Sequence, residues 1–336
     1  MKRKLLIAVA FFATMTAAAQ NIAAVSPSNT TTIYQTLDEA IVGAESGSTI
    51  YLPGGGFQIS DETKINKKLT IMGVSHRGDT DNVDGATIIG GNLYFEEGSS
   101  GSAILGVYVS GNINVGTETV PTTNFTARYC NVNSIQVKNS LSSGMIVNQC
   151  YLRNVSNFGN TNVKITNCIS DRIENIQNGT ISYNIIFYKN KIPKGYSYLG
   201  LCITGTANSK IIGNILEKPL YDNYWNSYGV SNCQVYNNYN ANGYDQSSNR
   251  DEDPIEINAP IYDLFEKWNN GSISPASNFH FKEEYKEYET QVGIYAGDGF
   301  SDEKSLAPIP RIISKKVAES TDESGKLQIV IKVKAQ

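Results

Sequence analysis

Short apolar stretches alternate with polar residues through the middle of the chain. The segment Val163–Ile176, "VKITNCISDRIENI", is one example of this pattern. Alternation of this kind predicts short strands with one face buried. A step from a polar to an apolar residue recurs at six anchor positions: Cys130, Cys150, Cys168, Ile185, Ile215 and Cys233.

The spacing of these anchors indicates a repeat. Consecutive anchors lie 20, 18, 17, 30 and 18 residues apart, and the long gap contains "YKNKIPKGYSYLG" (188–200), which indicates an insertion. Leucine-rich repeats have a similar period but need a leucine scaffold that this chain lacks. Short β-branched runs separated by Asn, Gly or Ser favour a parallel β-helix instead, with coils stacked about 4.8 Å apart. We therefore expect one continuous solenoid over residues 65–245.

Residues 20–64 have the pattern of an N-terminal cap followed by the first strands. Thr36 is positioned as a helix N-cap. The apolar residues after it share one helical face: Leu37, Ala40, Ile41 and Ala44. We expect this helix to end near Gly47, before a strand in "STIYLPGG".

Residues 246–336 are expected to form a closing coil and a β-hairpin. Ile261–Trp268 has the pattern of a short helix that covers the coils. Arg311–Val317 and Leu327–Lys334 flank a polar turn, which predicts a hairpin with half-buried strands. We expect the hairpin to pack along the solenoid or to close its end.

Three features stand in order before the first anchor: the predicted helix, "GSTIYLPGGGFQI" and "KKLTIMGVS". Together they resemble the opening of secreted bacterial right-handed parallel β-helix proteins of the pectin-lyase-like superfamily. The glycine-rich "GIYAGDG" at 293–299 is similar to the closing coil of many bacterial members. The resemblance implies an all-β, right-handed parallel β-helix solenoid with an N-terminal cap helix and a C-terminal β-hairpin extension. It does not select a function, because the superfamily contains lyases, hydrolases, adhesins and binding proteins.

The first residues predict export. Residues 1–19 combine a basic start, an apolar run and small residues, which is the pattern of a cleaved signal peptide. The apolar run is shorter than the roughly 20 residues of a membrane span. We therefore expect no spanning segment and a periplasmic, cell-surface or extracellular location. The net charge of −4 and the pI near 5.4 argue against nucleic acid as a partner. We expect a monomer.

The catalytic motifs of the resembled superfamily are missing from the sequence. Its pectate lyases share Arg-x-Pro-x-x-Arg, and its polygalacturonase-like branch shares Asn-Thr-Asp, Asp-Asp, Gly-His-Gly and Arg-Ile-Lys; none of these occurs. The two histidines, His76 and His280, leave acid–base catalysis on the coil surface without a histidine candidate. The sequence therefore favours a non-catalytic role without a cofactor.

Basic residues follow four of the anchors at offsets of three or four residues: Arg153, Arg172, Lys189 and Lys218. Equivalent positions stack in a solenoid, so these residues form a candidate ladder for an anionic glycan. Arg172 and Lys189 are also the candidates for a lyase base and a carboxylate-stabilising cation. Acidic neighbours such as Asp171 and Glu217 favour solvent-exposed ion pairs as the alternative.

Aromatic residues and asparagines are interleaved in residues 221–244, "YDNYWNSYGVSNCQVYNNYNANGY". Aromatic faces stack on sugar rings and amides bond hydroxyl groups. The candidate glycan ligands in this stretch are Tyr221, Tyr224, Trp225 and Tyr228. The alternative is packing of the tyrosines over the outer sheet, with the asparagines in left-handed turns.

The loop "DTDNVD" supplies the candidate metal site. Asp79, Asp81 and Asp84 place carboxylates close together beside glycines, which is typical of calcium loops. An EF-hand would need a glutamate at the twelfth position, where this chain has Gly90. A solvent-exposed loop is the competing interpretation.

The cysteines have a packing explanation. Cys168 shares its anchor position with Ile185 and Ile215, which indicates an inward apolar slot that cysteine fills as a small hydrophobe. Side chains in one column point the same way, so neither metal ligation nor a disulfide is expected between Cys130, Cys150 and Cys168. We expect buried free thiols.

Three functional hypotheses remain. The leading one is an exported, non-catalytic β-helix that binds polysaccharide at the cell surface or in the periplasm. The second is a polysaccharide lyase or glycoside hydrolase with an unrecognised site. The third is a structural or adhesive surface protein.

Overall fold

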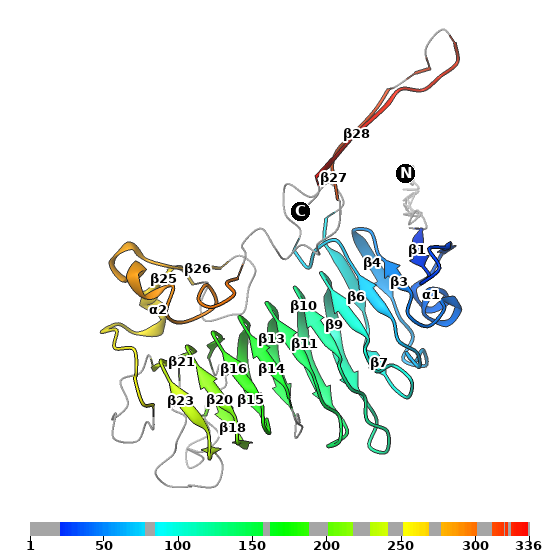
Figure 1. Cartoon of the computed structure of the whole chain (residues 1–336). Helices are drawn as coiled ribbons and strands as arrows, with labels where there is room; N and C mark the ends of the chain where they lie inside the picture. The colour runs from blue at the N-terminus through cyan, green and yellow to red at the C-terminus, as the bar shows by residue number, and fades with distance from the viewer. Residues whose placement is uncertain are drawn as a thin grey trace, which may run out of the picture.

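A computed structural model describes most of the chain. The described residues are 21–77, 85–156, 162–187, 201–217, 229–240, 251–268, 277–300, 311–318, 320–321 and 324–334. This part is mostly sheet with few helices, and most of its strands form two stacks of parallel strands, sheets A and B (Figure 1). The predicted signal peptide, residues 1–19, lies outside the described residues.

Sheet A has eleven strands, the first two of which are antiparallel. In spatial order they are β2 (Thr31–Tyr34), β1 (Ile22–Val25), β3 (Thr49–Tyr51), β5 (Thr70–Met72), β8 (Ala103–Leu105), β10 (Thr126–Arg128), β12 (Ile146–Asn148), β14 (Lys164–Thr166), β16 (Thr180–Ser182), β20 (Lys210–Ile212) and β23 (Gln234–Tyr236).

Sheet B is also eleven-stranded. Its main path is β24 (Tyr239–Asn240), β21 (Ile215–Leu216), β17 (Ile185–Ile186), β15 (Ile169–Glu174), β13 (Tyr151–Ser156), β11 (Asn131–Val137), β9 (Tyr108–Val115), β6 (Thr87–Gly90) and β4 (Gly55–Gln58). Beside this path, β7 (Leu93–Phe95) pairs with β9, and β18 (Ile203–Thr204) pairs with β15. A short parallel pair joins β19 (Thr206–Ala207) to β22 (Val230–Ser231).

From β3 to β6 and from β8 to β17 the chain passes alternately through the two sheets, so that one strand of each makes a rung, and β7 and β18 are additional strands of sheet B. Neighbouring rungs pair in parallel, beginning with β3 opposite β5. The middle residue of each sheet A strand from β3 onward is buried in one core: Ile50, Ile71, Ile104, Ala127, Val147, Ile165, Ile181, Ile211 and Val235. Parallel pairing thus begins before residue 65, because the strand that follows the cap helix already belongs to the stack.

The predicted cap helix is confirmed as α1 (Leu37–Gly43). Thr36 and Glu39 form a capping box, in which each side chain accepts a hydrogen bond from the other residue's backbone N–H. The buried face of the helix consists of Leu37, Ala40 and Ile41. The helix ends at Gly43 rather than near Gly47. No helix in the described residues is long and apolar enough to cross a membrane.

A left-handed turn residue precedes the sheet B strand of each rung from β9 onward. These residues are Gly106, Tyr129, Gln149, Asn167, Tyr183, Gly213 and Asn237. The next residue in each rung enters one buried column: Val107, Cys130, Cys150, Cys168, Asn184, Asn214 and Asn238. The polar residue before each cysteine is therefore the turn itself, in the left-handed region that asparagine tolerates better than most residues.

This column corrects the repeat alignment. Asn184 and Asn214 stand in register with Cys168. The predicted partners, Ile185 and Ile215, lie one residue further on. The alignment shifts because the core slot that cysteine fills in earlier rungs is filled by hydrogen-bonded asparagine in later ones.

The asparagines of the column form a ladder. Asn184 donates its backbone N–H and its amide to Asn214 Oδ1, at 3.0 and 2.9 Å. Asn214 donates the same two groups to Asn238 Oδ1, both at 2.9 Å. Asn238 in turn donates both groups to the Asp251 carboxylate at 3.0 Å, which ends the ladder at the last rung. The polar column is thereby satisfied inside the core.

All five cysteines are free, which confirms the predicted free thiols. Four are fully buried: Cys130, Cys150, Cys168 and Cys202. Burial raises the pKa of the Cys130 and Cys150 thiols well above the usual value. Cys233 departs from the expectation and is half-buried. It precedes β23, the terminal strand of sheet A, so no further strand of that sheet covers it.

Thiol labelling should separate these environments. In native buffer only Cys233, one of the five thiols, should react promptly with an aromatic disulfide reagent, and all five should react in denaturant. Cys233→Ser should abolish the native signal. Prompt native reaction of two or more thiols would contradict the buried column.

The described residues of 255–300 pack on the outer face of sheet B, and we call them the cover. They contain α2 (Ile261–Leu264), β25 (Phe265–Lys267), β26 (Asn278–Phe281) and the 3-10 helix η3 (Glu283–Tyr288). The helix predicted over Ile261–Trp268 is correct only in its first turn. The chain becomes a strand at Phe265, because Phe265 pairs with Phe281 and both rings are buried.

The glycine-rich segment 293–299 lies beside the stack rather than closing its end. Asn167 donates its amide to the carbonyls of Ile294 and Ala296, both at 2.8 Å. Backbone hydrogen bonds place residues 251–255 against the last rung instead.

The predicted hairpin is confirmed as β27 (Arg311–Val317) and β28 (Ile329–Lys334), but its predicted packing is wrong. In the described residues the two strands pair only with each other. The hairpin projects away from the sheets (Figure 1). Leu327, Ile329 and Ile331 are 46, 53 and 50% exposed, because no described element covers the ribbon.

Candidate functional site

The outer face of sheet B changes from polar to apolar along the stack. One outward position is occupied in successive rungs by Tyr108, Asn131, Tyr151, Ile169, Ile185, Ile215 and Tyr239. The residues from Tyr151 onward are buried in a second apolar cluster with the cover. Tyr108 and Asn131 remain half-exposed. The open part of the face therefore begins where the cover ends.

Three distant segments meet at this boundary. The Tyr151 ring packs edge-on against His76 at 5.2 Å and Phe300 at 5.8 Å between ring centroids. His76 is 4% exposed, and neither ring nitrogen has a hydrogen-bond partner among the residues that the structure describes. Burial first, and then the charge of Arg77, lower the pKa of His76 to about 3. The imidazole is therefore neutral at physiological pH and acts as an apolar wall.

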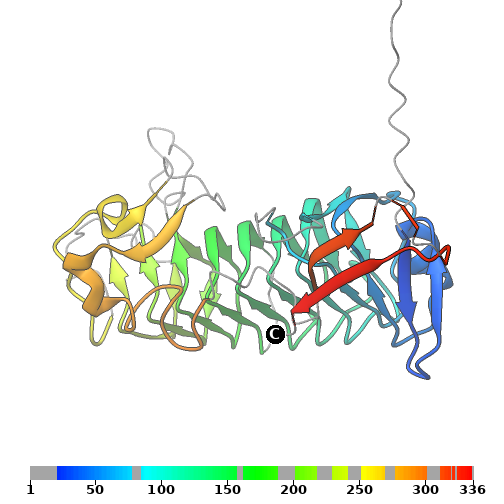
Figure 2. The same cartoon turned by 90° about the horizontal axis from the view of Figure 1, so that it is seen from above.

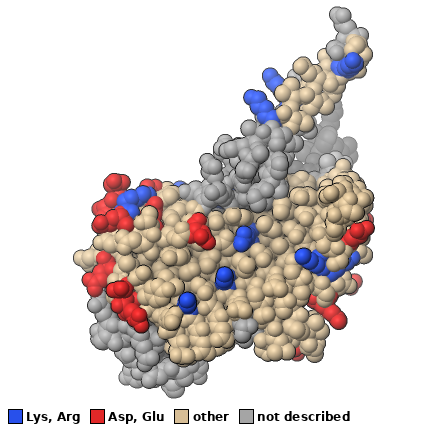
Figure 3. Space-filling model, viewed as in Figure 1, with Lys and Arg blue, Asp and Glu red and all other residues tan. Residues whose placement is uncertain are grey.

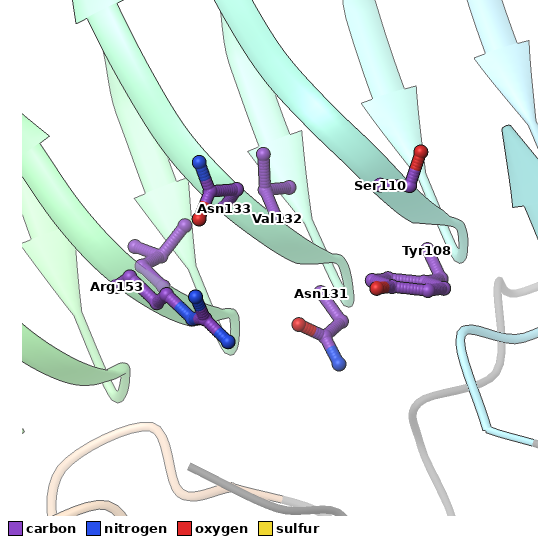
Figure 4. A pocket seen from close by; sticks show the side chains of 7 residues that line it. Tyr108, Ser110, Asn131, Val132, Asn133 and Arg153 are labelled. Atoms are coloured by element: carbon purple, nitrogen blue, oxygen red, sulfur yellow. The ribbon is translucent and has the colours of Figure 1, made fainter. Parts of the chain in front are cut away.

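A groove of about 190 Å³ adjoins the boundary on the open side. It is lined by residues of β9, β11 and β13: Tyr108, Ser110, Asn131, Val132, Asn133, Leu152 and Arg153. Figure 4 shows Asn131 between the Tyr108 ring and the Arg153 guanidinium. Three consecutive rungs thus contribute an aromatic face, an amide and a cation in a row.

The groove's polar groups are anchored by their neighbours. Asn133 donates its amide to Asn112 Oδ1 at 2.9 Å, and the Asn112 N–H donates to Asn92 Oδ1 at 2.9 Å. Arg153 is exposed, and no carboxylate in the described part of the chain forms an ion pair with it. Its guanidinium is therefore available to an anionic ligand.

Arg153 does not stack with Arg172 as the predicted ladder requires. Arg172 pairs in register with Asn154, the residue after Arg153. The two arginines follow their anchors at different offsets, so they stand one residue out of register. For this pair, the predicted ladder is wrong.

Arg172 is instead held by its own rung and the next. Its Nε lies 3.0 Å from Glu174 Oε1, and its Nη2 donates to Thr204 Oγ1 at 3.2 Å. The side chains of Arg172 and Glu174 are 21 and 20% exposed. This arrangement favours the ion-pair interpretation over a lyase base.

The other predicted site residues lie outside the described residues: Lys189, Lys218, Tyr221, Tyr224, Trp225, Tyr228, Asp79, Asp81 and Asp84. Among the residues that the structure describes, no group of three or more His, Cys, Asp or Glu side chains could hold a metal ion. Calcium stays a prediction for the aspartate loop alone.

The second histidine, His280, contacts other residues of the cover. His280 stacks on Tyr295 at 4.0 Å, and its Nδ1 lies 3.1 Å from Glu289 Oε1. Burial opposes ionisation of Glu289, but hydrogen bonds from Lys286, the Phe281 N–H and His280 lower its pKa below the usual value. His280, like His76, is absent from the residues that line the groove.

Sequence reasoning does not identify Tyr108, Asn131 or Asn133 as site residues. The available signal is positional, since Tyr108 and Asn131 directly follow Val107 and Cys130, which belong to the buried column. Comparisons with models of protein families, with curated proteins and with solved structures found no match. The function is therefore inferred from the residues of the groove.

Proposed function

We propose that the chain is an exported right-handed parallel β-helix that binds an anionic polysaccharide in the groove on sheet B. Alternation of strands between two parallel sheets supports the β-helix, and parallel crossovers are almost always right-handed. The basic and apolar start of the sequence supports export to the periplasm, the cell surface or the medium, where polysaccharides occur.

The row of Tyr108, Asn131 and Arg153 is the observation that carries this proposal. An aromatic face stacks on the apolar side of a sugar ring, and an amide both donates to and accepts from hydroxyl groups. A guanidinium binds a carboxylate through two parallel hydrogen bonds. A uronate-containing chain offers all three partners in succession.

Binding fits the groove better than cleavage. Its described lining holds one cation, Arg153, and no carboxylate or imidazole. Elimination from a uronate needs a base beside the cation that stabilises the carboxylate, and hydrolysis needs a pair of acidic groups. A lyase or a hydrolase would need catalytic groups from residues outside this lining.

Arg153→Gln should weaken binding of a uronate oligosaccharide about 10- to 100-fold, because a charge-assisted hydrogen bond contributes about 1.5–3 kcal/mol. Calorimetric titration of the purified protein measures this change. Lys210→Gln is the matched control, because Lys210 is an exposed cation in sheet A. The affinity of the Lys210→Gln variant for the oligosaccharide should stay within about twofold of that of the unaltered protein.

Equal losses in the two variants would contradict a site at Arg153. A neutral oligosaccharide bound as tightly as the uronate would contradict the anionic substrate class. Release of unsaturated products, detected by their absorbance, would show that the protein is a lyase and not only a binding protein. Failure of every glycan to bind would favour the structural or adhesive hypothesis.

A further inference from the structure

The β27–β28 hairpin is an amphipathic ribbon with an uncovered apolar face. Residues directly opposite each other share a face, so Val317 and Ile329 lie together, and Ile331 is two residues along the same face, with Lys315 opposite it. Lys316 pairs with Val330 on the other face, which also carries Lys332. Val317 is 45% exposed and Ile329 is 53% exposed. Exposed apolar surface of this kind marks an interaction site.

The ribbon is also strongly basic. The sequences of β27 and β28 contain five basic residues and no acidic ones: Arg311, Lys315, Lys316, Lys332 and Lys334. Two such ribbons placed edge to edge would oppose like charges, which disfavours a hairpin–hairpin contact. The ribbon needs an acidic partner that also offers apolar or aromatic surface.

The cover presents such a surface. Its exposed carboxylates include Asp263, Glu266, Glu283 and Glu284. The Lys286 ammonium is bonded to Glu289 and also lies in the field of Glu266 and Glu283, so these carboxylates are neighbours. Tyr262, 47% exposed, adds an aromatic ring beside them on α2. Figure 3 shows acidic residues gathered over the cover and basic residues on the hairpin.

The two surfaces lie far apart along the stack in Figures 1 and 2. We propose that the hairpin of one molecule docks on the acidic surface of the cover of a second copy. Two copies that exchange hairpins in this way form a closed two-fold pair, in which each contact occurs twice. This contact replaces the monomer expected from the sequence, and it does not depend on glycan binding.

Complementary charge reversals test the contact. Lys316→Glu/Lys332→Glu alters the hairpin, and Glu283→Lys/Glu284→Lys alters the cover; all four residues are exposed. Sedimentation of the full chain across micromolar concentrations should show self-association that weakens with added salt. Each double variant alone should associate at least about tenfold more weakly. An equimolar mixture of the two should recover association, because each variant supplies the charge that the other lacks.

Lys164→Glu/Lys210→Glu is the matched control, since it makes the same change in net charge on exposed residues of sheet A. It should associate as the unaltered chain does. A monomer at every concentration, or association that survives the hairpin reversal, would overturn the proposal. Hairpin-dependent flotation with phosphatidylglycerol vesicles, without self-association, would assign the ribbon to a lipid surface instead and would also overturn it.

Discussion

Asn214→Ala should lower the free energy of unfolding by about 3–5 kcal/mol. Asn214 is fully buried, and its amide donates to the carbonyls of Ile181 and Ile212 as well as to Asn238. Alanine would remove the amide that donates to these three oxygens and the Oδ1 that accepts both donors of Asn184, in a core that water does not reach. The Asn184 backbone N–H would lose its acceptor, whereas the Asn184 amide would keep its hydrogen bond to the Ile165 carbonyl. Buried polar networks lose more than one bond's worth of stability when a member is removed.

Urea unfolding followed by circular dichroism measures the Asn214 effect. Asn66→Ala is the control, because Asn66 is exposed, and it should change stability by less than about 0.5 kcal/mol. A loss below about 1 kcal/mol in Asn214→Ala would mean that the ladder contributes little to the stack.

Stability should fall as the pH drops below about 6.5, with His76 as one identified cause. The pKa of His76 is lowered to about 3 in the folded chain, so the unfolded chain binds the proton first. The stabilisation is complete above the unfolded pKa and is lost as the pH falls towards the folded value. The slope approaches about 1.4 kcal/mol per pH unit, or about 2 kcal/mol between pH 6.5 and 5.

Comparison with His76→Phe isolates this contribution. Phenylalanine keeps an aromatic ring against Tyr151 but does not titrate. The difference in unfolding free energy between the two proteins should therefore shift by about 2 kcal/mol in favour of the variant between pH 6.5 and 5. Parallel pH profiles would show that the imidazole is not buried in neutral form.

Local patterns were sufficient for the cap helix and the hairpin. Thr36 and Glu39 carry the capping signal within four residues of each other, and the helix forms where that signal stands. The hairpin strands likewise begin and end within two residues of the predicted ends. In both elements the residues that determine the structure are close in sequence.

The register of the stack could not be derived in the same way. Asparagine in "YNII" and "GNIL" looks like a turn residue by composition, yet Asn184 and Asn214 are in the core. Their burial depends on Asn238 and Asp251, which satisfy the ladder from later rungs. Only pairing between rungs distinguishes a buried asparagine from an exposed one.

The candidate groove is equally non-local. Arg153 could be selected from the sequence, because a cation after an anchor suggests an exposed position. Its neighbours Tyr108 and Asn131 become a site only because the cover stops at Tyr151, where His76 and Phe300 also arrive. The sequence of one rung does not show how far along sheet B the cover extends, because the cover is more than 100 residues later in the chain.

A crystal structure of the protein with a bound uronate oligosaccharide tests the glycan assignment most directly. The expected result is a sugar ring over Tyr108, with hydroxyl groups on the Asn131 amide and a carboxylate on the Arg153 guanidinium. A sugar bound away from these residues, with the groove left to solvent at saturating ligand, would contradict the assignment.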